Sequence, residues 1–181
     1  MKITSYKEIN PFEATFILEG TSREANLIRK YLIGGVEVYA IDSVLMYINK
    51  TSYPSEYIAH RMGMIPIKSK GNKQEYLINL DIKAKSKTTI TTNDLILEED
   101  LEIPVKIELF DLLPNQELKL IGKVKKGRGF NHAKFQCGIA SYEEKDGVFY
   151  FHFETLYQYT AKDLLEKAKK AIVEDIKAIW E

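Results

Sequence analysis

The stretch TSREANLIRKYLIGGVEVYAIDSVLMYINK, residues 21–50, predicts a helix that leads directly into a long strand. Thr21 and Glu24 have the spacing of a capping box, in which each side chain satisfies a free backbone N–H of the other residue. Gly34 and Gly35 are expected to end the helix by adopting a left-handed conformation. Four apolar residues fall on one face of this helix: Leu27, Ile28, Tyr31 and Leu32.

Further strands are expected on both sides of this helix. The strand that follows the helix is apolar on both faces around residues 40–48. Another strand, near residues 13–18, precedes the helix. Near the other end of the chain, GVFYFHFETL, residues 147–156, alternates strictly between two faces. One face carries Phe149, Phe151 and Phe153, and the other carries Tyr150, His152 and Glu154. The polar face is expected to be solvated.

The chain closes with an amphipathic helix over residues 160–180, for which Thr160 is the expected N-cap. Its apolar stripe runs the full length of the helix and comprises Leu164, Leu165, Ala168, Ala171, Ile172, Ile176 and Ile179. A stripe of this length needs a wide surface to cover it. Either the rest of the chain or another chain supplies that surface.

The middle of the chain, residues 67–140, is expected to form a β-rich module of its own. Before it, SEYIAHRMGMIP, residues 55–66, predicts a short helix that Ser55 caps and Gly63 ends. Two interpretations of this helix remain equally open. Its methionines and arginine suit a docking surface, and an ordinary surface helix would turn the same apolar side toward its own core.

Length and composition limit the classes of protein. A chain of 181 residues makes one fairly large domain or two small ones. Its 26 basic and 26 acidic residues balance, which argues against a general nucleic-acid coat protein. A single cysteine, Cys137, allows no internal disulfide and fits a reducing intracellular compartment. No stretch approaches the roughly 20 apolar residues of a membrane span.

The candidate chemical sites are weak. The three histidines, His60, His132 and His152, lack close ligand spacing, so neither a metal nor a cofactor is expected. Cys137 could act as a nucleophile, but a lone thiol is more often simply packed. The basic stretch GKVKKGRGFNHAKF, residues 122–135, could contact nucleic-acid phosphates or an acidic neighbour within the fold. We therefore expect no catalytic residues.

Several motifs, in order, resemble the alpha-like assembly subunits of RNA polymerases, a family that includes the third-largest subunit of eukaryotic RNA polymerase II and the D subunit of archaeal polymerases. The family pattern has an Ala-Asn-x-x-Arg-Arg helix, an Ala-Ile-Asp-Ser-Val strand and the string Glu-Phe-Ile-Ala-His-Arg-Leu-Gly-Leu-Ile-Pro. Here these elements read ANLIRK (25–30), AIDSV (40–44) and EYIAHRMGMIP (56–66). NQELKLIGKVKKGRGFNHAKF, residues 115–135, is similar to a later family stretch, with Phe135 in place of tryptophan.

The resemblance implies an α+β fold, with an alpha-subunit-like dimerisation domain built from both chain ends and interrupted by a β-rich insert domain. The expected ranges are residues 1–48 and 143–181 for the dimerisation domain, and residues 49–142 for the insert. Eukaryotic members carry a four-cysteine zinc loop after Ile-Pro, whereas this chain has KSKGNKQEYL there, so zinc is not carried over. Some archaeal members hold an iron–sulfur or ferredoxin-like insertion where this chain has only QCGIASYEEKDG, so it resembles a minimal member.

The resemblance also implies partners, and with them a role as a non-catalytic subunit of a DNA-directed RNA polymerase. A smaller alpha-like chain, similar to the L subunit of archaeal polymerases or to the eleventh eukaryotic subunit, is expected to bind Asn26, Leu27, Ile28, Arg29, Tyr31, Leu164, Leu165, Ala168, Ile172 and Ile176. Their division between interface and internal core stays open. The second-largest polymerase subunit is expected to dock on Glu56, His60, Arg61, Arg128, His132 and Lys134.

Small zinc-binding polymerase subunits are further possible partners, and nucleic acid is expected to be reached only through the complex. The expected location is the cytoplasm of an archaeal cell, or a viral factory or virion, or the nucleus in a eukaryote, without membrane attachment. The alternative hypothesis is a stand-alone nucleic-acid-binding protein that uses the basic 122–135 loop.

Overall fold

The computed structural model describes residues 2–180 and divides into two compact units. Unit 1 comprises the chain up to Val38 and from Arg128 onward, and unit 2 comprises Tyr39–Gly127. Both units contain antiparallel sheets, and helices accompany them, so the predicted α+β class is confirmed. Among the described residues, no helix is long and apolar enough to cross a membrane.

The sheet of unit 1 joins the two ends of the chain. Its strand order is β1 (Lys2–Asn10), β2 (Glu13–Glu19), β12 (Val148–Thr155) and β11 (Gly138–Lys145), and every neighbouring pair is antiparallel. In the central β2–β12 pair, Phe16 lies opposite Phe151, and their rings stack with centroids 4.6 Å apart. Burial of this aromatic pair sets the register, because a slip of one residue would expose both rings.

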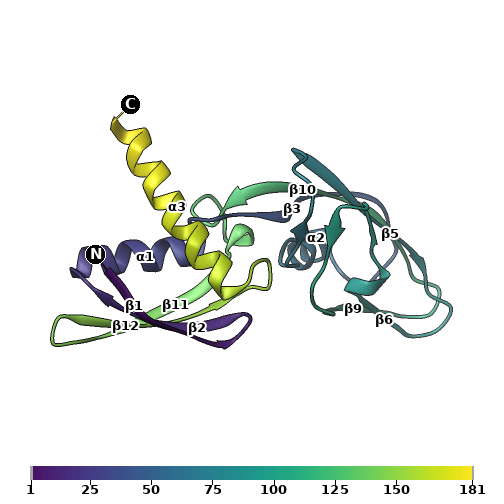
Figure 1. Ribbon diagram of the computed structural model, residues 1–181. Coiled ribbons are helices and arrows are strands. Elements are labelled where there is room, and N and C mark those ends of the chain that lie inside the picture. Colours follow the sequence, from purple (N-terminus) through teal and green to yellow (C-terminus); the bar gives the residue numbers. More distant parts are fainter. Residues whose placement is uncertain (1, 181) are drawn as a thin grey trace. The chain divides into compact units, whose positions relative to one another are not determined.

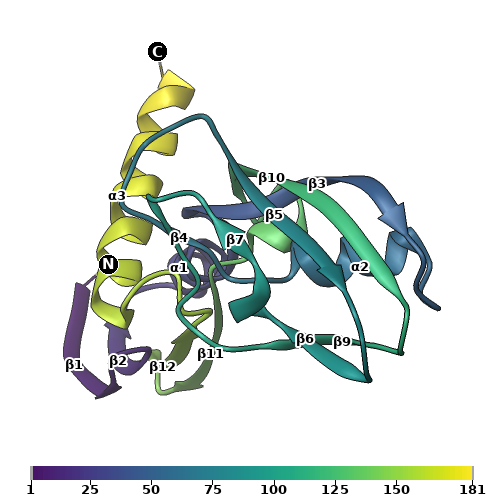
Figure 2. The same cartoon turned by 90° about the vertical axis from the view of Figure 1, so that its right-hand side faces the viewer.

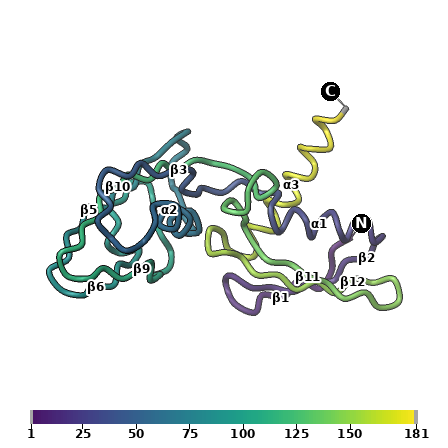
Figure 3. The backbone as a smooth tube through the Cα atoms, turned by 180° about the vertical axis from the view of Figure 1, so that it is seen from behind, coloured from purple at the N-terminus to yellow at the C-terminus, as the bar shows by residue number. Residues whose placement is uncertain are grey.

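Two helices lie on one face of this sheet, α1 (Ser22–Gly34) and α3 (Ala161–Trp180) (Figures 1 and 3). Phe149, Phe151 and Phe153 all point into the core between sheet and helices, as their alternation predicted. The capping box of α1 is present: the Thr21 hydroxyl accepts from the Glu24 N–H at 3.3 Å, and the Glu24 carboxylate accepts from the Thr21 N–H at 2.8 Å.

The glycines at the end of α1 act differently from the prediction. Gly35 is right-handed, with φ of −85°, so the expected left-handed cap is wrong. Both glycines are required by close packing instead. A Cβ on Gly34 would lie 3.0 Å from the Cα of Gly129, and a Cβ on Gly35 would overlap the ring of Tyr31. The backbone of residues 129 and 130 can therefore lie directly against the end of α1, where the Phe130 N–H donates to the Gly34 carbonyl at 3.2 Å.

Unit 2 is built from one larger sheet and two short ribbons. The sheet has the order β3 (Glu37–Asn49), β10 (Glu117–Arg128), β5 (Glu75–Lys83) and β7 (Ile96–Leu97). One ribbon pairs β4 (Lys68–Ser69) with β8 (Leu101–Glu102), and the other pairs β6 (Thr88–Thr91) with β9 (Glu108–Leu112). The β6–β9 ribbon lies across the core of the unit from β5 and β10 (Figures 1 and 2).

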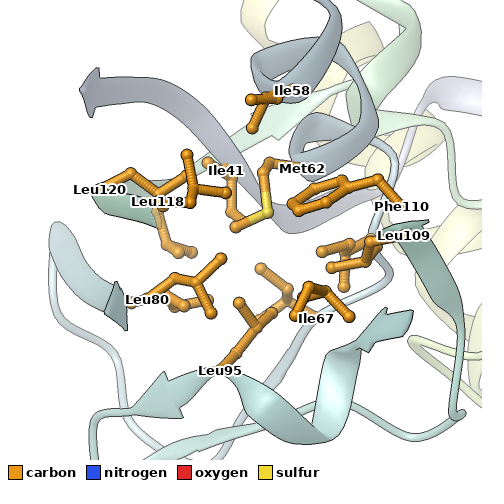
Figure 4. Packing of buried hydrophobic residues seen from close by; sticks show 14 of the residues in the cluster. Ile41, Ile58, Met62, Ile67, Leu80, Leu95, Leu109, Phe110, Leu118 and Leu120 are labelled. Atoms are coloured by element: carbon orange, nitrogen blue, oxygen red, sulfur yellow. The ribbon is translucent and has the colours of Figure 1, made fainter. Parts of the chain in front are cut away.

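The core of unit 2 gathers side chains from nearly all of these elements (Figure 4). Helix α2 (Ser55–Gly63) contributes Ile58 and Met62, which are both fully buried. The predicted cap at Ser55 is wrong, because Pro54 occupies the N-cap position and no side chain caps the helix. The Ser55 hydroxyl instead lies 3.1 Å from the side-chain nitrogen of Asn49, which ties the start of α2 to the end of β3.

The observed boundaries between the two units differ from the expected domain boundaries, which lay between residues 48 and 49 and between residues 142 and 143. Those positions fall inside β3 and β11, whereas the units separate after Val38 and Gly127. Most of β3 belongs to unit 2, since Ile41 lies in its core. The segment before β11 belongs to unit 1, since the Cys137 N–H donates to the Ile33 carbonyl of α1 at 2.9 Å.

Candidate protein-interaction surface

The two halves of α3 differ in what covers their apolar side chains. We divide the helix after Ile172; in this first half, Ala161, Leu164, Leu165, Ala168, Ala171 and Ile172 are buried in the core of unit 1. In the second half, Val173, Ile176 and Ile179 expose 51%, 46% and 77% of their surface, and these three residues form the α3 tip. The last turns of α3 extend beyond α1 and the sheet (Figures 1 and 3). The α3 tip therefore continues the buried stripe into solvent.

A polar network holds α3 where its exposed half begins. Nη1 of Arg128 donates to both carboxylate oxygens of Asp175, at 2.9 and 2.6 Å, and the Tyr31 hydroxyl donates to Oδ2 of Asp175 at 2.6 Å. The hydrogen bonds from Arg128 and Tyr31 lower the pKa of Asp175. Burial, assisted by the Asp175 hydrogen bond, raises the pKa of Tyr31 to about 12. The network connects α1, the end of β10 and α3.

An apolar groove lies between the end of α1 and residues 129–136. Its volume is about 660 Å³, and Tyr31, Ile33 and Phe130 form much of its wall. The rings of Tyr31 and Phe130 meet edge to face with centroids 5.3 Å apart, and Phe130 is 53% exposed. Tyr31 lines this groove and also donates its hydroxyl hydrogen bond to Asp175 on α3. The groove therefore adjoins the base of the α3 tip.

The residues expected at a partner interface fall into two groups. Six of them are buried within unit 1, so they stabilise its own fold: Ile28, Tyr31, Leu164, Leu165, Ala168 and Ile172. The others reach the surface, with Asn26 and Ile176 exposed and Leu27 and Arg29 half-buried. Sequence reasoning did not single out Val173 or Phe130. Val173 is an apolar residue beside the predicted stripe, and that was the one signal available for it.

The residues expected to contact a large polymerase subunit also fall into two groups. Arg61 is turned toward its own unit, since its guanidinium donates to the carbonyls of Glu108 and Leu109 at 2.6 and 3.2 Å. Arg128 belongs to the Asp175 network. Nδ1 of His132 accepts from the backbone N–H of Lys134 at 3.2 Å and so caps the short helix η2 (Ala133–Phe135).

On α2, the expected docking residues Glu56 and His60 are exposed. Tyr57 lies in the same helix and is 44% exposed, and Met64, the residue after the end of α2, is 57% exposed. Because Ile58 and Met62 are buried, the apolar side of α2 packs on the core of unit 2, as the second interpretation expected. The other side presents a mixed polar and apolar surface to solvent, and the docking interpretation of that side stays a prediction.

The first half of the basic stretch lies on strand β10, and three of its cations, Lys123, Lys125 and Arg128, face acidic side chains. Lys123 lies 3.8 Å from Glu75, and Lys125 lies 3.7 Å from Asp42 and 3.8 Å from Glu75. These separations favour the acidic neighbour over nucleic-acid phosphates as the partner of these lysines. Such exposed pairs contribute little to stability, so they mainly reduce the local positive potential.

Cys137 is packed rather than poised for chemistry. The residue is fully buried, and its sulfur lies 3.3 Å from the Leu32 carbonyl oxygen. Burial raises the pKa of the Cys137 thiol to about 11, so little of the reactive thiolate exists near neutral pH. The structure therefore favours the packed interpretation of this residue.

The relatives found among known proteins all carry one name. No protein-family model matches the chain. DNA-directed RNA polymerase subunit Rpo3 of Methanocaldococcus jannaschii is 32% identical over 162 residues, which cover 88% of this chain and 84% of that protein. Subunit Rpo3 of Pyrococcus horikoshii is 34% identical over 140 residues, covering 71% of this chain and 54% of that protein. Subunit Rpo3 of Thermococcus kodakarensis is 25% identical over 191 aligned positions, covering 96% of this chain and 74% of that protein. The match thus extends over about half the length of the Pyrococcus horikoshii relative and most of the other two.

Proposed function

Because the chain belongs to the Rpo3 family of DNA-directed RNA polymerase subunits, we propose that it is an assembly subunit that pairs with a smaller alpha-like chain. Unit 1 acts as the dimerisation domain, and unit 2 acts as the insert domain. The resulting pair forms the platform that receives the second-largest subunit. The chain contributes to the geometry of the polymerase rather than to the chemistry of nucleotide transfer.

The observation that carries this proposal is the exposure of the α3 tip. Its three apolar side chains follow the buried stripe along the helix, and their spacing of three residues places neighbouring ones side by side in an apolar ridge. Contiguous exposed apolar surface of this kind marks sites of protein contact. The groove at Tyr31 and Phe130 adds an aromatic wall beside the base of the ridge. A helix of the smaller chain that covers the ridge could place an anchoring side chain in this groove.

The driving force is the removal of apolar surface from water, at about 25 cal/mol per Å². Obligate interfaces bury about 2,000 Å² or more, so the α3 tip is the centre of the contact rather than all of it. Asn26, Leu27 and Arg29, at the surface of α1, extend the proposed interface. The Arg128–Asp175–Tyr31 network joins α3 to the rest of unit 1 at the base of the ridge, and we infer that it holds the ridge in place for the partner.

The platform function is assigned to unit 2. The exposed side of α2, with Glu56, Tyr57, His60 and Met64, is the surface we propose for contact with the second-largest subunit. Lys134, near the groove of unit 1, is a further docking residue. Small zinc-binding polymerase subunits complete the set of partners, and the chain meets nucleic acid only through the assembled enzyme.

The test is co-expression with a smaller chain of the archaeal L type, followed by size-exclusion chromatography with mass determination. We expect a stable one-to-one complex with the native chain. The double variant Ile176→Asp/Ile179→Asp places two charges on the ridge and should abolish the complex while leaving the circular dichroism spectrum unchanged. Ile139→Asp is the matched control, since Ile139 is 56% exposed and lies on β11 rather than on a helix.

The alternative, a stand-alone nucleic-acid-binding protein, gives the opposite result. The isolated chain would bind DNA or RNA tightly, with an affinity that falls steeply as salt is added, and no smaller chain would co-purify with it. That outcome would refute the assembly function.

A further inference from the structure

The outer face of the sheet in unit 1, opposite the helices, carries an imidazole beside two carboxylates. The ligand atoms of Glu13, His152 and Glu154 all lie within 4.8 Å of one another. We propose that these three residues bind a divalent transition-metal ion, with Zn²⁺ as the best fit. This site is separate from the α3 tip and from the groove, and it adds a ligand-binding function to the assembly role.

The three residues are brought together by the pairing of β2 with β12. Glu13 lies directly opposite Glu154 in the register, and His152 lies opposite Thr15, two residues away along the same face. Nε2 of His152 is 2.8 Å from Oε1 of Glu13. The buried Phe16–Phe151 stack, one step further along the same pair of strands, sets this register. The site therefore lies on a regularly paired part of the sheet, without a register shift between β2 and β12.

The ligand chemistry suits zinc better than calcium or magnesium. Imidazole nitrogen with carboxylate oxygen is a usual zinc donor set, whereas calcium and magnesium prefer oxygen alone. Zinc bonds of about 2.0–2.2 Å in a tetrahedral site place neighbouring ligand atoms about 3.4 Å apart. Side-chain rotations that move the ligand atoms of Glu13, His152 and Glu154 by about 1 Å would bring them to that spacing. Three protein ligands leave a fourth position for water or for a side chain of a partner.

Two features of the surroundings support a metal rather than a simple ion pair. Like charges directly opposite each other on neighbouring strands are destabilising, and Glu13 faces Glu154 in this way. A dication bound between the two carboxylates attracts both of them and so offsets their mutual repulsion. In addition, the Asn10 side chain donates to Oε2 of Glu13 at 2.7 Å, which leaves Oε1 directed at His152. Bound carboxylates in metal sites are commonly oriented by such second hydrogen bonds.

There is also room for a fourth ligand. A hollow of about 370 Å³ adjoins His152 on the side of β1, where the pairing between β1 and β2 shifts register. Its polar lining comprises Ser5, Lys7, Thr15, Tyr150 and His152. Spacing along the chain could not reveal the site, because Glu13 and His152 come from opposite ends of the sequence.

The first test is titration of the untagged, metal-stripped full chain with ZnCl₂ by isothermal calorimetry. We expect one equivalent of Zn²⁺ to bind, and binding to weaken by at least about tenfold in His152→Ala and in Glu154→Gln. The controls are His60→Ala, which removes an exposed histidine of unit 2, and Glu143→Gln, which removes an exposed glutamate of β11. Both should bind Zn²⁺ as the native chain does. Co²⁺ provides a second readout through the visible absorption bands of a tetrahedral complex.

The second test uses the sign of the Glu154→Gln effect on the melting temperature. With a chelator present, the variant should melt at a higher temperature than the native chain, because the repulsion from Glu13 is removed. With Zn²⁺ present, the native chain should gain stability and the variant should not. Absence of Zn²⁺ binding, or binding that survives His152→Ala, would overturn the proposal and leave the cluster as a hydrogen-bonded group without a metal. Complex formation with the smaller chain, measured in chelator, should be the same for all of these variants, so the two proposals fail independently.

Discussion

The first and second halves of α3 have the same kind of sequence and opposite surroundings. Leu164, Leu165 and Ala168 are buried against the sheet and α1, whereas Val173, Ile176 and Ile179 of the α3 tip are exposed. A helix of 20 residues is about 30 Å long, and only its first turns face the sheet (Figure 1). The contrast teaches that periodicity identifies an apolar stripe, but the packing of the whole domain decides which part of the stripe is internal.

The largest effect should come from the first half. Leu164→Ala removes a fully buried side chain and leaves a cavity between α3 and the sheet, so the free energy of unfolding should fall by about 2–5 kcal/mol. Urea denaturation followed by circular dichroism measures this loss. Ile176→Ala is the matched control and should change the free energy of unfolding by less than about 0.5 kcal/mol. Equal losses for the two variants would mean that the second half is also packed within the chain.

Affinity for the smaller chain should show the reverse order. Ile176→Ala truncates the middle of the α3 tip, and we expect the dissociation constant of the heterodimer to rise about tenfold, which corresponds to about 1.4 kcal/mol. Fluorescence titration with a labelled chain of the archaeal L type measures it. Lys162→Ala, an exposed change on the first half of α3, serves as the control and should leave the constant unchanged. If both variants bind equally well, the ridge is not the interface.

A smaller effect is expected where the two halves meet. Tyr31→Phe keeps the ring against Phe130 but removes the hydroxyl that donates to Asp175 at 2.6 Å. Because Asp175 is partly exposed and keeps both bonds from Arg128, the loss of this hydrogen bond should lower the free energy of unfolding by about 1 kcal/mol, less than is usual for a charged acceptor. If this bond also fixes the direction of the α3 tip, association with the smaller chain should slow. Stopped-flow kinetics would detect that change, and an unaltered association rate would limit the network to a stabilising role.

Much of unit 1 could be predicted from local patterns. The alternation at Phe149, Phe151 and Phe153 and the Thr21–Glu24 capping box depend on neighbouring residues, and both were confirmed. The glycine prediction failed because the constraint on Gly34 comes from Gly129, a residue far away in the sequence. Unit 2 was less predictable in detail, since strands of two residues such as β4, β7 and β8 are too short to show alternation.

The candidate surface shows the same limit. Ile176 was predicted as an interface residue, but the same periodicity selected Ile28 and Leu164, which are internal. Phe130 was not predicted as a surface residue, because its contact with Tyr31 depends on the return of the chain to α1. The pair of His152 and Glu13 likewise depends on β2 meeting β12. Contacts between the two ends of the chain carry information that no local pattern contains.

The smallest expected effect is a pH dependence at the junction between the halves of α3. Arg128 and Tyr31 lower the pKa of Asp175 below its ordinary value of 3.8, so its ionised form contributes stability above that value. This contribution is lost as the pH falls through the lowered pKa. Tyr31, whose pKa burial raises from 10.0 to about 12, contributes in its protonated form, and that stability is lost as the pH rises from 10 to 12.

The network should therefore stabilise unit 1 between about pH 4 and pH 10. In Asp175→Asn, the free energy of unfolding should fall less steeply as the pH is lowered below about 4. Other carboxylates titrate in the same range, so the informative quantity is the difference in free energy of unfolding between the native chain and the variant, measured from pH 2 to pH 7. That difference should be greatest near neutral pH and shrink toward pH 2. Because Arg128 and Asp175 are about one-third exposed, solvent screens the pair and the effect should be small. A difference that does not vary with pH would show that Asp175 acts only by shape and hydrogen bonding, and that its charge does not hold the exposed half of α3 in place.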